Sequence, residues 1–343
     1  MNEFVIETCG EEAYLLFIKY VNIDSGNTLL LSTSTIFNIQ KATPNITAII
    51  NIQRVNDFRY INKMFEAVNL KLNNENIYIG CFETFSARRK RKPINKIPII
   101  SLFYFGMEYI FLRVFPKIWG LKKIYFFITR GKNRLLSKAE VLGRLVSCGF
   151  EIIEYVNIKG YTYFVVKKIK STEFNMKPSY GPVFKMSRVG KHGKIIGVYK
   201  VRTMYAFAEY LQKYIYEKNG STNGDKANDD FRVSTFGKFI RKCWIDEVPM
   251  LINLIKGEIK LIGPRPLSVP KFNMYPKYAQ EKRCQFKPGL IPPFYYDLPN
   301  SFDDLVKSEM KYLSEYEKHP FRTDFKYFFM AIYNIIFKGA RSK

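Results

Sequence analysis

The chain has 343 residues and a formal net charge of +25, because 55 Lys and Arg residues outnumber 30 Asp and Glu residues. Hydrophobic residues make up 47% of the chain, which excludes wholesale disorder and leaves enough apolar surface for a large core. The length predicts two domains. The positive charge predicts a polyanionic partner, but composition alone does not choose among nucleic acid, an anionic membrane and a phosphorylated substrate.

The five cysteines do not have the spacing of a zinc site. Scattered cysteines of this kind are typical of a reducing compartment. The first residues, Met1-Asn2-Glu3-Phe4, lack the basic region and the apolar stretch of a signal peptide. We therefore expect the chain to lie on the cytoplasmic side of any membrane that it contacts.

The first half of the chain predicts an α/β domain over residues 1–170. Residues 47–52 and 76–82 are compact apolar segments that predict strands, and Asn56 is expected to cap a helix between them. The apolar residues of that helix recur at helical spacing and are expected to be buried. They are Phe58, Ile61, Phe65 and Val68.

A second helix and a hairpin complete this half. Ser137 and Glu140 have the spacing of a capping box that opens a helix, and Gly149 is expected to end it. Strands at 151–156 and 161–166 are then expected to pair. This arrangement resembles the later half of a class I methyltransferase fold, which implies a Rossmann-like domain. Because no glycine-rich loop for an adenosyl cofactor follows an early strand, the resemblance implies a non-catalytic domain, with methylation of a glycan or lipid as the alternative.

A basic cluster at 88–92 precedes an apolar run at 99–115, which contains two ionisable residues, Glu108 and Arg113. Seventeen helical residues extend about 25 Å, less than the roughly 30 Å of hydrocarbon in a bilayer. The segment at 97–118 is therefore predicted to lie in a membrane interface, where the basic cluster favours anionic lipids. A core helix behind a solvated basic loop is the alternative.

The residues that carry chemistry are concentrated at 236–266. Asp246 is expected to cap a helix that has Pro249 in its first turn and ends at Gly257. The positive end of a helix favours an ionised carboxylate and holds phosphate oxygens, and the adjacent Glu247 can share a divalent cation with Asp246. The buried face of this helix is expected to consist of Leu251, Leu254 and Ile255.

Arg265 lies between two prolines, whose restricted backbone would hold its guanidinium in position for bidentate contact with phosphate. Taken alone, these residues also fit an ordinary acidic helix cap and a proline-rich turn.

The motifs that begin at Phe184 closely resemble, in their order, the bacterial sugar transferase family. Its members are monotopic phosphoglycosyl transferases that load a sugar phosphate onto polyprenyl phosphate. The similar elements are Arg188-Val189-Gly190, Tyr199-Lys200-Val201-Arg202-Thr203-Met204, Asp230-Phe231-Arg232, Asp246-Glu247-Val248-Pro249, Asn253-Leu254-Ile255-Lys256-Gly257-Glu258 and Gly263-Pro264-Arg265-Pro266. The resemblance implies a mostly helical, membrane-associated catalytic domain over residues 171–343.

The resemblance further implies a two-step phosphoryl transfer. Asp246 would attack the sugar-bearing phosphorus of a nucleoside diphosphate sugar, most often a UDP-sugar, and polyprenyl phosphate would then take the phosphosugar from the enzyme. Asp246 and Glu247 would bind Mg2+, and Glu247 would assist activation of the acceptor. The expected phosphate and nucleotide ligands are Lys200, Arg202, Arg232, Arg241 and Arg265.

The resemblance places this activity at the cytoplasmic face of the bacterial inner membrane, where it would initiate surface glycan synthesis. Membrane lipids are the expected partners, nucleic acid is not, and a homodimer is left open. Family members usually have a re-entrant membrane helix just before the stretch matched at Phe184, and the segment at 97–118 is expected to replace it here. A basic nucleic-acid-binding protein is the alternative function, although no helix-turn-helix, RRM-like or zinc pattern supports it.

Overall fold

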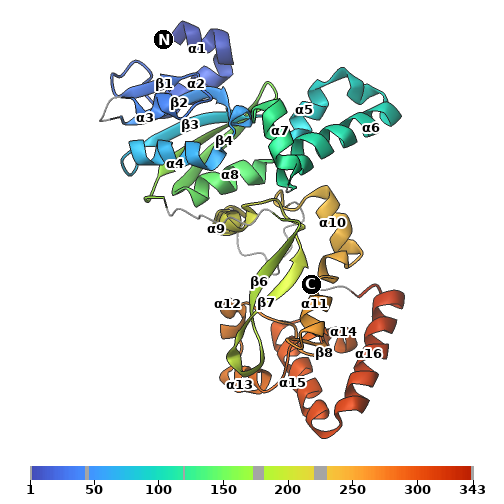
Figure 1. The fold of residues 1–343 in the computed structure, drawn as a ribbon. Helices are drawn as coiled ribbons and strands as arrows, with labels where there is room; N and C mark the ends of the chain where they lie inside the picture. The colour runs from blue at the N-terminus through green and yellow to red at the C-terminus, as the bar shows by residue number, and fades with distance from the viewer. Residues whose placement is uncertain (1, 43–45, 119, 173–180, 220–229, 341–343) are drawn as a thin grey trace. The chain divides into compact units, whose positions relative to one another are not determined.

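The computed structural model describes residues 2–340 except 43–45, 119, 173–180 and 220–229. The described residues divide into two units (Figure 1). Unit 1 contains the described residues up to 172 together with 204–219 and 230–232, and unit 2 contains 181–203 and 233–340. The domain boundary expected between residues 170 and 171 stays a prediction.

Unit 1 is built on a five-stranded sheet with the order β1-β2-β3-β5-β4. The strands are β1 (Thr28–Leu31), β2 (Ala48–Arg54), β3 (Ile77–Phe82), β4 (Phe150–Ile158) and β5 (Tyr161–Lys168). Strands β1, β2 and β3 run parallel, whereas β5 lies between β3 and β4 and runs antiparallel to both. All four strands that the sequence predicted are confirmed.

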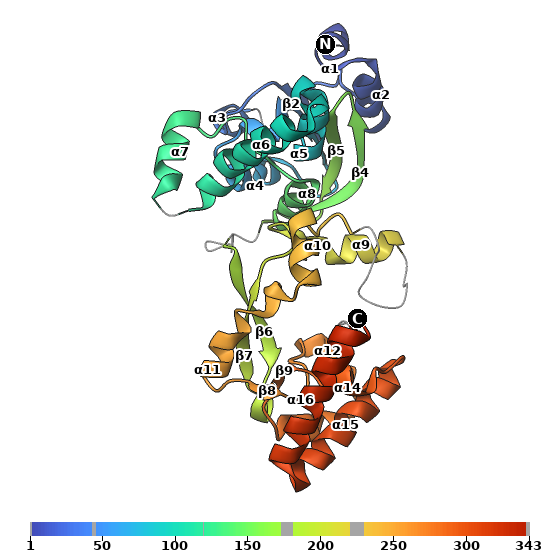
Figure 2. The same ribbon diagram turned by 90° about the vertical axis from the view of Figure 1, so that its right-hand side faces the viewer.

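Helices cover both faces of this sheet (Figures 1 and 2). The helices of unit 1 are α1 (Asn2–Cys9), α2 (Glu11–Tyr20), α3 (Phe37–Gln40), α4 (Ile61–Lys71), α5 (Phe85–Arg91), α6 (Pro98–Tyr109), α7 (Leu121–Thr129), α8 (Lys138–Ser147) and α9 (Gln212–Asn219). Helices α1 and α2 share one apolar core with Ile50 and Ile79, and α4 and α8 share another with Ile49 and Tyr78. Neighbouring strand residues thus point to opposite faces, which gives a three-layer α/β unit. The predicted α/β class is confirmed, and the relation to methyltransferases stays a prediction.

Asn56 does not cap a helix, contrary to the sequence prediction. Helix α4 begins at Ile61, and Asn56 lies in a separate 3-10 turn. Its buried amide nitrogen donates to the carbonyl oxygens of Glu83 and Arg134, each at 2.8 Å, and its oxygen accepts from the Glu83 N–H at 2.7 Å. Asn56 therefore joins three distant segments instead of satisfying a helix end. The four predicted apolar residues, Phe58, Ile61, Phe65 and Val68, are all buried.

The predicted start and end of α8 are confirmed. The Ser137 hydroxyl accepts the Glu140 N–H at 3.2 Å, and Gly149 follows the helix in the left-handed region with a φ of 87°. The hairpin between β4 and β5 turns at Lys159 and Gly160, whose φ values are 46° and 85°. Two consecutive positive φ angles are typical of the tight turn that matches strand twist.

The predicted interfacial segment is helical. Helix α6 continues into a π-helical turn, Ile110–Val114, and α7 follows shortly afterwards. Among the described residues, no helix combines the length and the apolar character that crossing a bilayer requires.

Unit 2 is mostly helical, as predicted, and has two small sheets. Strands β6 (Val183–Val189) and β7 (Ile195–Val201) form an antiparallel hairpin, and β8 (Lys260–Ile262) pairs in parallel with β9 (Gly289–Ile291). The helices are α10 (Thr235–Lys242), α11 (Met250–Ile255), α12 (Val269–Asn273), α13 (Lys277–Cys284), α14 (Phe294–Asp297), α15 (Phe302–Lys318) and α16 (Pro320–Phe337). The association of this unit with a membrane stays a prediction.

The buried Tyr312 and the partly buried Tyr316 link the last two helices to β8. The Tyr312 hydroxyl lies 3.0 Å from the carbonyl oxygen of Ile262 and 2.6 Å from Asp324, and Lys260 lies 2.9 Å from the same Asp324 carboxylate. The Lys260 ammonium also lies 3.3 Å from the ring centroid of Tyr316. These contacts join α15 and α16 to the small parallel sheet.

The parallel pair depends on two glycines. A Cβ atom at Gly289 would lie 2.1 Å from the backbone nitrogen of Gly263. The Gly289→Ala substitution is therefore expected to destabilise unit 2 by about 1–3 kcal/mol, the usual cost of overpacking. The measurement is the midpoint of urea unfolding. Gly197→Ala is the control, because a methyl group there meets only the flexible Lys185 side chain at 3.3 Å. Equal midpoints for the two variants would contradict the close approach.

Candidate active site

Asp246 and Glu247 lie in a single 3-10 turn that precedes α11. The expectation that Asp246 caps the helix is wrong, because α11 begins at Met250 and Pro249 occupies the cap position. A capping carboxylate at residue 246 would need the N–H of residue 248 or 249. The Val248 N–H instead donates to a carbonyl oxygen within the turn, and proline has no N–H. The carboxylate of Asp246 is thus not engaged by the helix start.

The exposed side of α11 also differs from the prediction. Leu251 and Ile255, which were expected to be buried, are 45% and 85% exposed, while Leu254 is partly buried. The buried residues are Met250 and Asn253, which face β7 and its neighbours. A helix of six residues is too short for its apolar periodicity to determine which side packs. Gly257 follows the helix with a φ of 68°, so the predicted end is confirmed.

Lys200 brings a positive charge to the two carboxylates. Its Nζ atom, at the end of β7, lies 2.7 Å from Oε1 of Glu247, and both side chains are largely buried. Asp246 is half-buried and, among the described residues, forms no ion pair of its own. Burial raises the pKa of Asp246, the charge of Lys200 lowers it, that of Glu247 raises it and that of Arg241 lowers it. A hydrogen bond from its own backbone N–H lowers the pKa further. Two cations therefore act on the Asp246 carboxylate, which has no ion-pair partner among the described residues.

Helix α10 positions Arg241. Ser234 caps this helix by accepting the Gly237 N–H at 2.9 Å, and its own N–H donates to the carbonyl oxygen of Thr203 at 3.2 Å. A Cβ atom at Gly237 would lie 2.0 Å from that same carbonyl oxygen, so only glycine allows this approach. One turn later, Arg241 Nε donates to the Thr203 hydroxyl at 2.8 Å. The start of α10 is thus fixed on the segment that follows Lys200.

Asn253 is a positioning residue that the sequence analysis did not select. Its buried side chain donates to the Gly197 carbonyl oxygen at 2.9 Å and accepts the Tyr199 N–H at 2.9 Å, both on β7. It also donates to the Glu258 carboxylate at 2.5 Å. These bonds hold α11 against β7 and so hold the turn with Asp246 beside Lys200. The Asn-Leu-Ile-Lys-Gly-Glu motif contained the signal.

A buried arginine holds the backbone of Arg265. Its carbonyl oxygen accepts from Arg283 Nη2 at 2.6 Å, and Arg283 is held by a buried ion pair with Glu309. Burial lowers the pKa of Arg188, and the nearby charge of Arg265 lowers it further. Among the described residues, neither Arg188 nor Arg265 forms an ion pair. The charges of the two guanidinium groups thus act on each other, and Arg188, part of the Arg-Val-Gly motif, was not among the predicted ligands.

The remaining two predicted ligands lie in other surroundings. Arg202 Nε donates to the Gly181 carbonyl oxygen at 3.1 Å, and its guanidinium lies 4.7 Å from the ring centroid of Phe184. Arg232 belongs to unit 1, where Asp230 holds its guanidinium at 2.6 Å. The structure therefore groups Asp246, Glu247, Lys200 and Arg241, and the phosphate-binding roles of Arg202 and Arg232 stay predictions.

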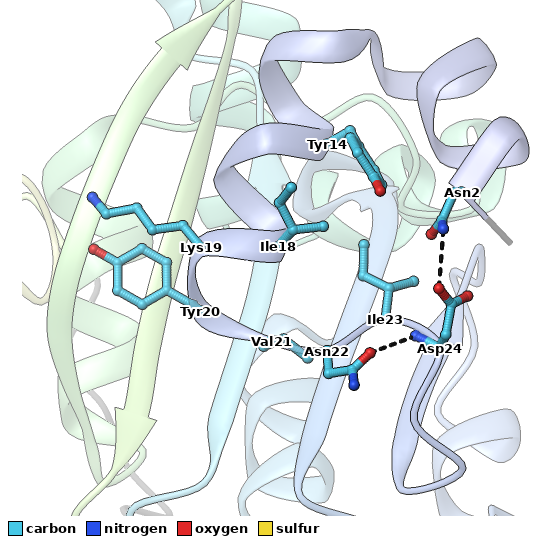
Figure 3. A pocket seen from close by; sticks show the side chains of 9 residues that line it. All are labelled: Asn2, Tyr14, Ile18, Lys19, Tyr20, Val21, Asn22, Ile23 and Asp24. Atoms are coloured by element: carbon cyan, nitrogen blue, oxygen red, sulfur yellow. Dashed lines mark hydrogen bonds between the residues drawn. The ribbon is translucent and has the colours of Figure 1, made fainter.

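A shallow pocket of about 550 Å³ lies in unit 1 at the end of α2 (Figure 3). Asn2 donates to Asp24 at 3.0 Å, and the Asp24 N–H donates to Asn22 at 3.2 Å. The buried side-chain oxygen of Asn2 has no hydrogen-bond partner among the described residues. It contains none of the predicted site residues. In the described part of the chain, no group of three or more His, Cys, Asp or Glu side chains converges as metal ligands would.

Removal of the Asn253 amide tests how the site is held. Asn253→Ala is expected to lower the free energy of unfolding of unit 2 by about 3 kcal/mol, because buried partners on β7 and at Glu258 lose their hydrogen bonds. Urea unfolding measures the change. Asn300→Ala, at an exposed position of the same unit, is the control. A midpoint like that of the control would show that Asn253 does not hold α11.

The electrostatics of Asp246 can be measured directly. In metal-free protein, the Asp246 carboxylate is expected to titrate above the ordinary aspartate value of about 4. Glu247→Gln should lower this pKa, because a like charge is removed, and Lys200→Met should raise it, because a favourable cation is lost. Carbon-13 NMR of labelled aspartate gives the titration. Shifts of the opposite sign in either variant would contradict this arrangement of charges.

The chain is similar to known proteins over its C-terminal half. A family model described as bacterial sugar transferase matches residues 164–338. The chain is 38% identical over 141 residues to the galactosyl transferase CpsE of Streptococcus agalactiae serotype III (strain NEM316), covering 40% of this chain and 31% of that protein.

Two further relatives have names that state an acceptor. The chain is 34% identical over 101 residues to the undecaprenyl-phosphate galactose phosphotransferase of Salmonella typhimurium, covering 28% of this chain and 21% of the relative. It is 30% identical over 115 residues to the UDP-glucose:undecaprenyl-phosphate glucose-1-phosphate transferase of Xanthomonas campestris pv. campestris, covering 33% and 22%.

The chain thus spans only between about a fifth and a third of the length of these three relatives. The family model, in contrast, extends over half of the chain and includes every residue of the Asp246 site. The chain belongs to the bacterial sugar transferase family.

Proposed function

We propose that this chain transfers a sugar 1-phosphate from a nucleoside diphosphate sugar to polyprenyl phosphate. The observation that carries the proposal is the turn at Asp246 and Glu247, where two carboxylates meet the cations Lys200 and Arg241. The names of two relatives specify undecaprenyl phosphate as the acceptor, and one of them specifies UDP-glucose as the donor. These names support undecaprenyl phosphate and a UDP-sugar as the substrates here.

In the first step, an Asp246 carboxylate oxygen attacks the sugar-bearing phosphorus of the donor. A bond forms between that oxygen and the phosphorus, and the bond to the bridging oxygen breaks. The nucleoside monophosphate leaves with the electron pair, and the phosphosugar remains on Asp246. The half-burial of Asp246 favours attack, because a partly desolvated carboxylate has little water to shed. The charges of Lys200 and Arg241 offset the negative charge of the phosphoryl oxygens.

In the second step, a phosphate oxygen of the polyprenyl phosphate attacks the same phosphorus. The bond to Asp246 breaks, the carboxylate is restored, and the product is a polyprenyl diphosphate sugar. Because the phosphosugar is held on the enzyme between the two steps, the two anionic substrates never need to meet. Glu247 follows Asp246 in the same turn and is ion-paired with Lys200. It would assist activation of the acceptor phosphate.

The two adjacent carboxylates fit a magnesium ion. Mg2+ is usually held by one or two protein carboxylates and keeps its other positions for water and substrate phosphates. Burial and the charge of Glu247 disfavour the ionised form of Asp246, and a divalent cation would offset both effects. Asp246 and Glu247 would hold this ion, which when bound would neutralise charge on the phosphoryl oxygens.

Apolar residues beside Asp246 support an acceptor that is a lipid. Ile245, Val248 and Ile252 belong to the same turn and helix and are all exposed. An exposed apolar rim next to a charged site suits a substrate with a phosphate head and a hydrocarbon chain. The same rim supports a location at the cytoplasmic face of the bacterial inner membrane and a role in starting surface glycan synthesis.

We further infer that unit 1 is a methyltransferase-like domain without catalytic activity. In open α/β sheets, ligands bind at the carboxyl ends of the parallel strands. At that edge, Arg54 pairs with Asp57 at 3.2 Å and with the buried Glu83 at 3.3 Å, and Arg91 lies 2.7 Å from Glu83. These ion pairs occupy the groups that a ligand would use, which supports a structural role.

Substitution of the nucleophile tests the proposal. Asp246→Asn is expected to lower the release of nucleoside monophosphate from a UDP-sugar by at least about a thousandfold, because an amide cannot form the covalent intermediate. Incubation with a donor labelled in the sugar should leave label on wild-type protein and none on the variant. The assay contains Mg2+ and polyprenyl phosphate, and a panel of UDP-sugars identifies the donor.

Asp303→Asn is the matched control, because Asp303 is an exposed carboxylate of unit 2 in the first turn of α15. It should keep both wild-type turnover and labelling. Turnover by Asp246→Asn at the wild-type rate would refute the proposed mechanism.

A further inference from the structure

We propose that α6, the π-helical turn Ile110–Val114 and α7 form a docking surface for an anionic lipid bilayer. This surface, residues 97–128 without residue 119, is called the α6–α7 surface below. It belongs to a helical lobe beside the sheet of unit 1 (Figure 1). It lies outside residues 164–338, so it is independent of the family match and of the proposed chemistry.

Large apolar side chains of the α6–α7 surface face solvent. Ile99 and Phe127 are 85% and 86% exposed, and Leu102 and Phe103 are each 73% exposed. Neighbours on both helices, such as Ile100 on α6 and Ile124 on α7, are also exposed. A cluster of large exposed apolar side chains on one segment marks an interaction surface. The alternative of an internal core helix is therefore wrong for this segment.

The charged residues Glu108 and Arg113 of the same segment are buried inside the protein. Glu108 is buried by ion pairs with Arg88 at 2.8 Å and with Lys92 at 2.6 Å. Arg113 is buried, donates to the Leu135 carbonyl oxygen at 2.8 Å and pairs with Glu140. The only two acidic or basic residues of 97–116 are thus neutralised inside the protein. A helix that turns its charges inward and its apolar side chains outward is suited to an apolar medium.

The surroundings of the α6–α7 surface are strongly basic. Residues 84–139 contain fourteen Lys and Arg residues and one acidic residue, Glu108, which is already paired. Arg89, Lys90, Lys122 and Lys123 are exposed. Anionic lipid headgroups would complement these charges where the apolar side chains enter the acyl boundary. A second copy of the same surface would instead bring like charges together, which argues against a homodimer through this face.

The length of the helices determines how they meet the bilayer. Helix α6 has twelve residues and spans about 18 Å, well short of the hydrocarbon thickness. The helices therefore lie in the interface plane instead of crossing. This places the anchor within unit 1 and gives the chain a membrane contact that does not depend on unit 2.

Vesicle co-sedimentation of the full chain tests the apolar part of this surface. The variant with Leu102→Glu and Phe103→Glu is expected to bind phosphatidylglycerol-containing vesicles at least about tenfold more weakly than wild type. The control variants Phe37→Glu and Leu70→Glu change similarly exposed apolar residues of unit 1 that lie outside the surface, and they should bind as wild type does. Circular dichroism confirms that each variant is folded.

The charge contribution is tested with a second pair of changes. Lys122→Gln and Lys123→Gln should each weaken binding to anionic vesicles about fivefold and should leave the weaker binding to phosphatidylcholine vesicles unchanged. Hydrogen–deuterium exchange of the unmodified chain gives a local readout, because anionic vesicles should slow exchange in peptides from 97–128.

Two results would overturn the proposal. One is wild-type vesicle binding by the double glutamate variant together with unchanged exchange in 97–128. The other is a change from dimer to monomer in that variant, measured by light scattering, without any loss of vesicle binding. The second result would make the α6–α7 surface an interface between copies of the chain.

Discussion

The ion pair between Lys200 and Glu247 is the contact on which the candidate site depends. It joins the end of β7 to the turn that carries Asp246, and it places one cation near two carboxylates. Because Glu247 takes the direct bond to Lys200, the positive charge acts on the Asp246 carboxylate without an ion pair between the two. Partial burial strengthens the effect of the Lys200 charge on both carboxylates, since charges interact more strongly where water is scarce.

Several other residues of unit 2 determine where the backbone lies. Gly237 lets α10 approach Thr203, and Asn253 fastens α11 to β7. Gly289 lets β9 run close to β8, and Arg283 fixes the backbone of Arg265. Their side chains, or the absence of one, determine backbone positions. Only a few charged groups then act on the Asp246 carboxylate, so a family motif records the scaffold as much as the chemistry.

Ion pairs also hold the charged groups that are buried in unit 1. Its buried carboxylates, such as Glu83 and Glu140, are matched by arginines, because an unpaired charge in the interior is costly. Glu108 pairs with Arg88, and Arg113 pairs with Glu140, both inside the unit. The outer side of α6 therefore carries neither of these charges. The inward ion pairs and the outward apolar residues are therefore two consequences of one arrangement. This arrangement suits unit 1 to the proposed contact with a bilayer.

The sequence by itself determined the strands of unit 1, the capping of α8 by Ser137 and the adjacency of Asp246 and Glu247, because these follow from local spacing. Only the tertiary structure decided which distant groups meet. Lys200 pairs with Glu247, and Arg188 lies near Arg265. Such pairings depend on how strands and helices pack, which no spacing along the chain encodes.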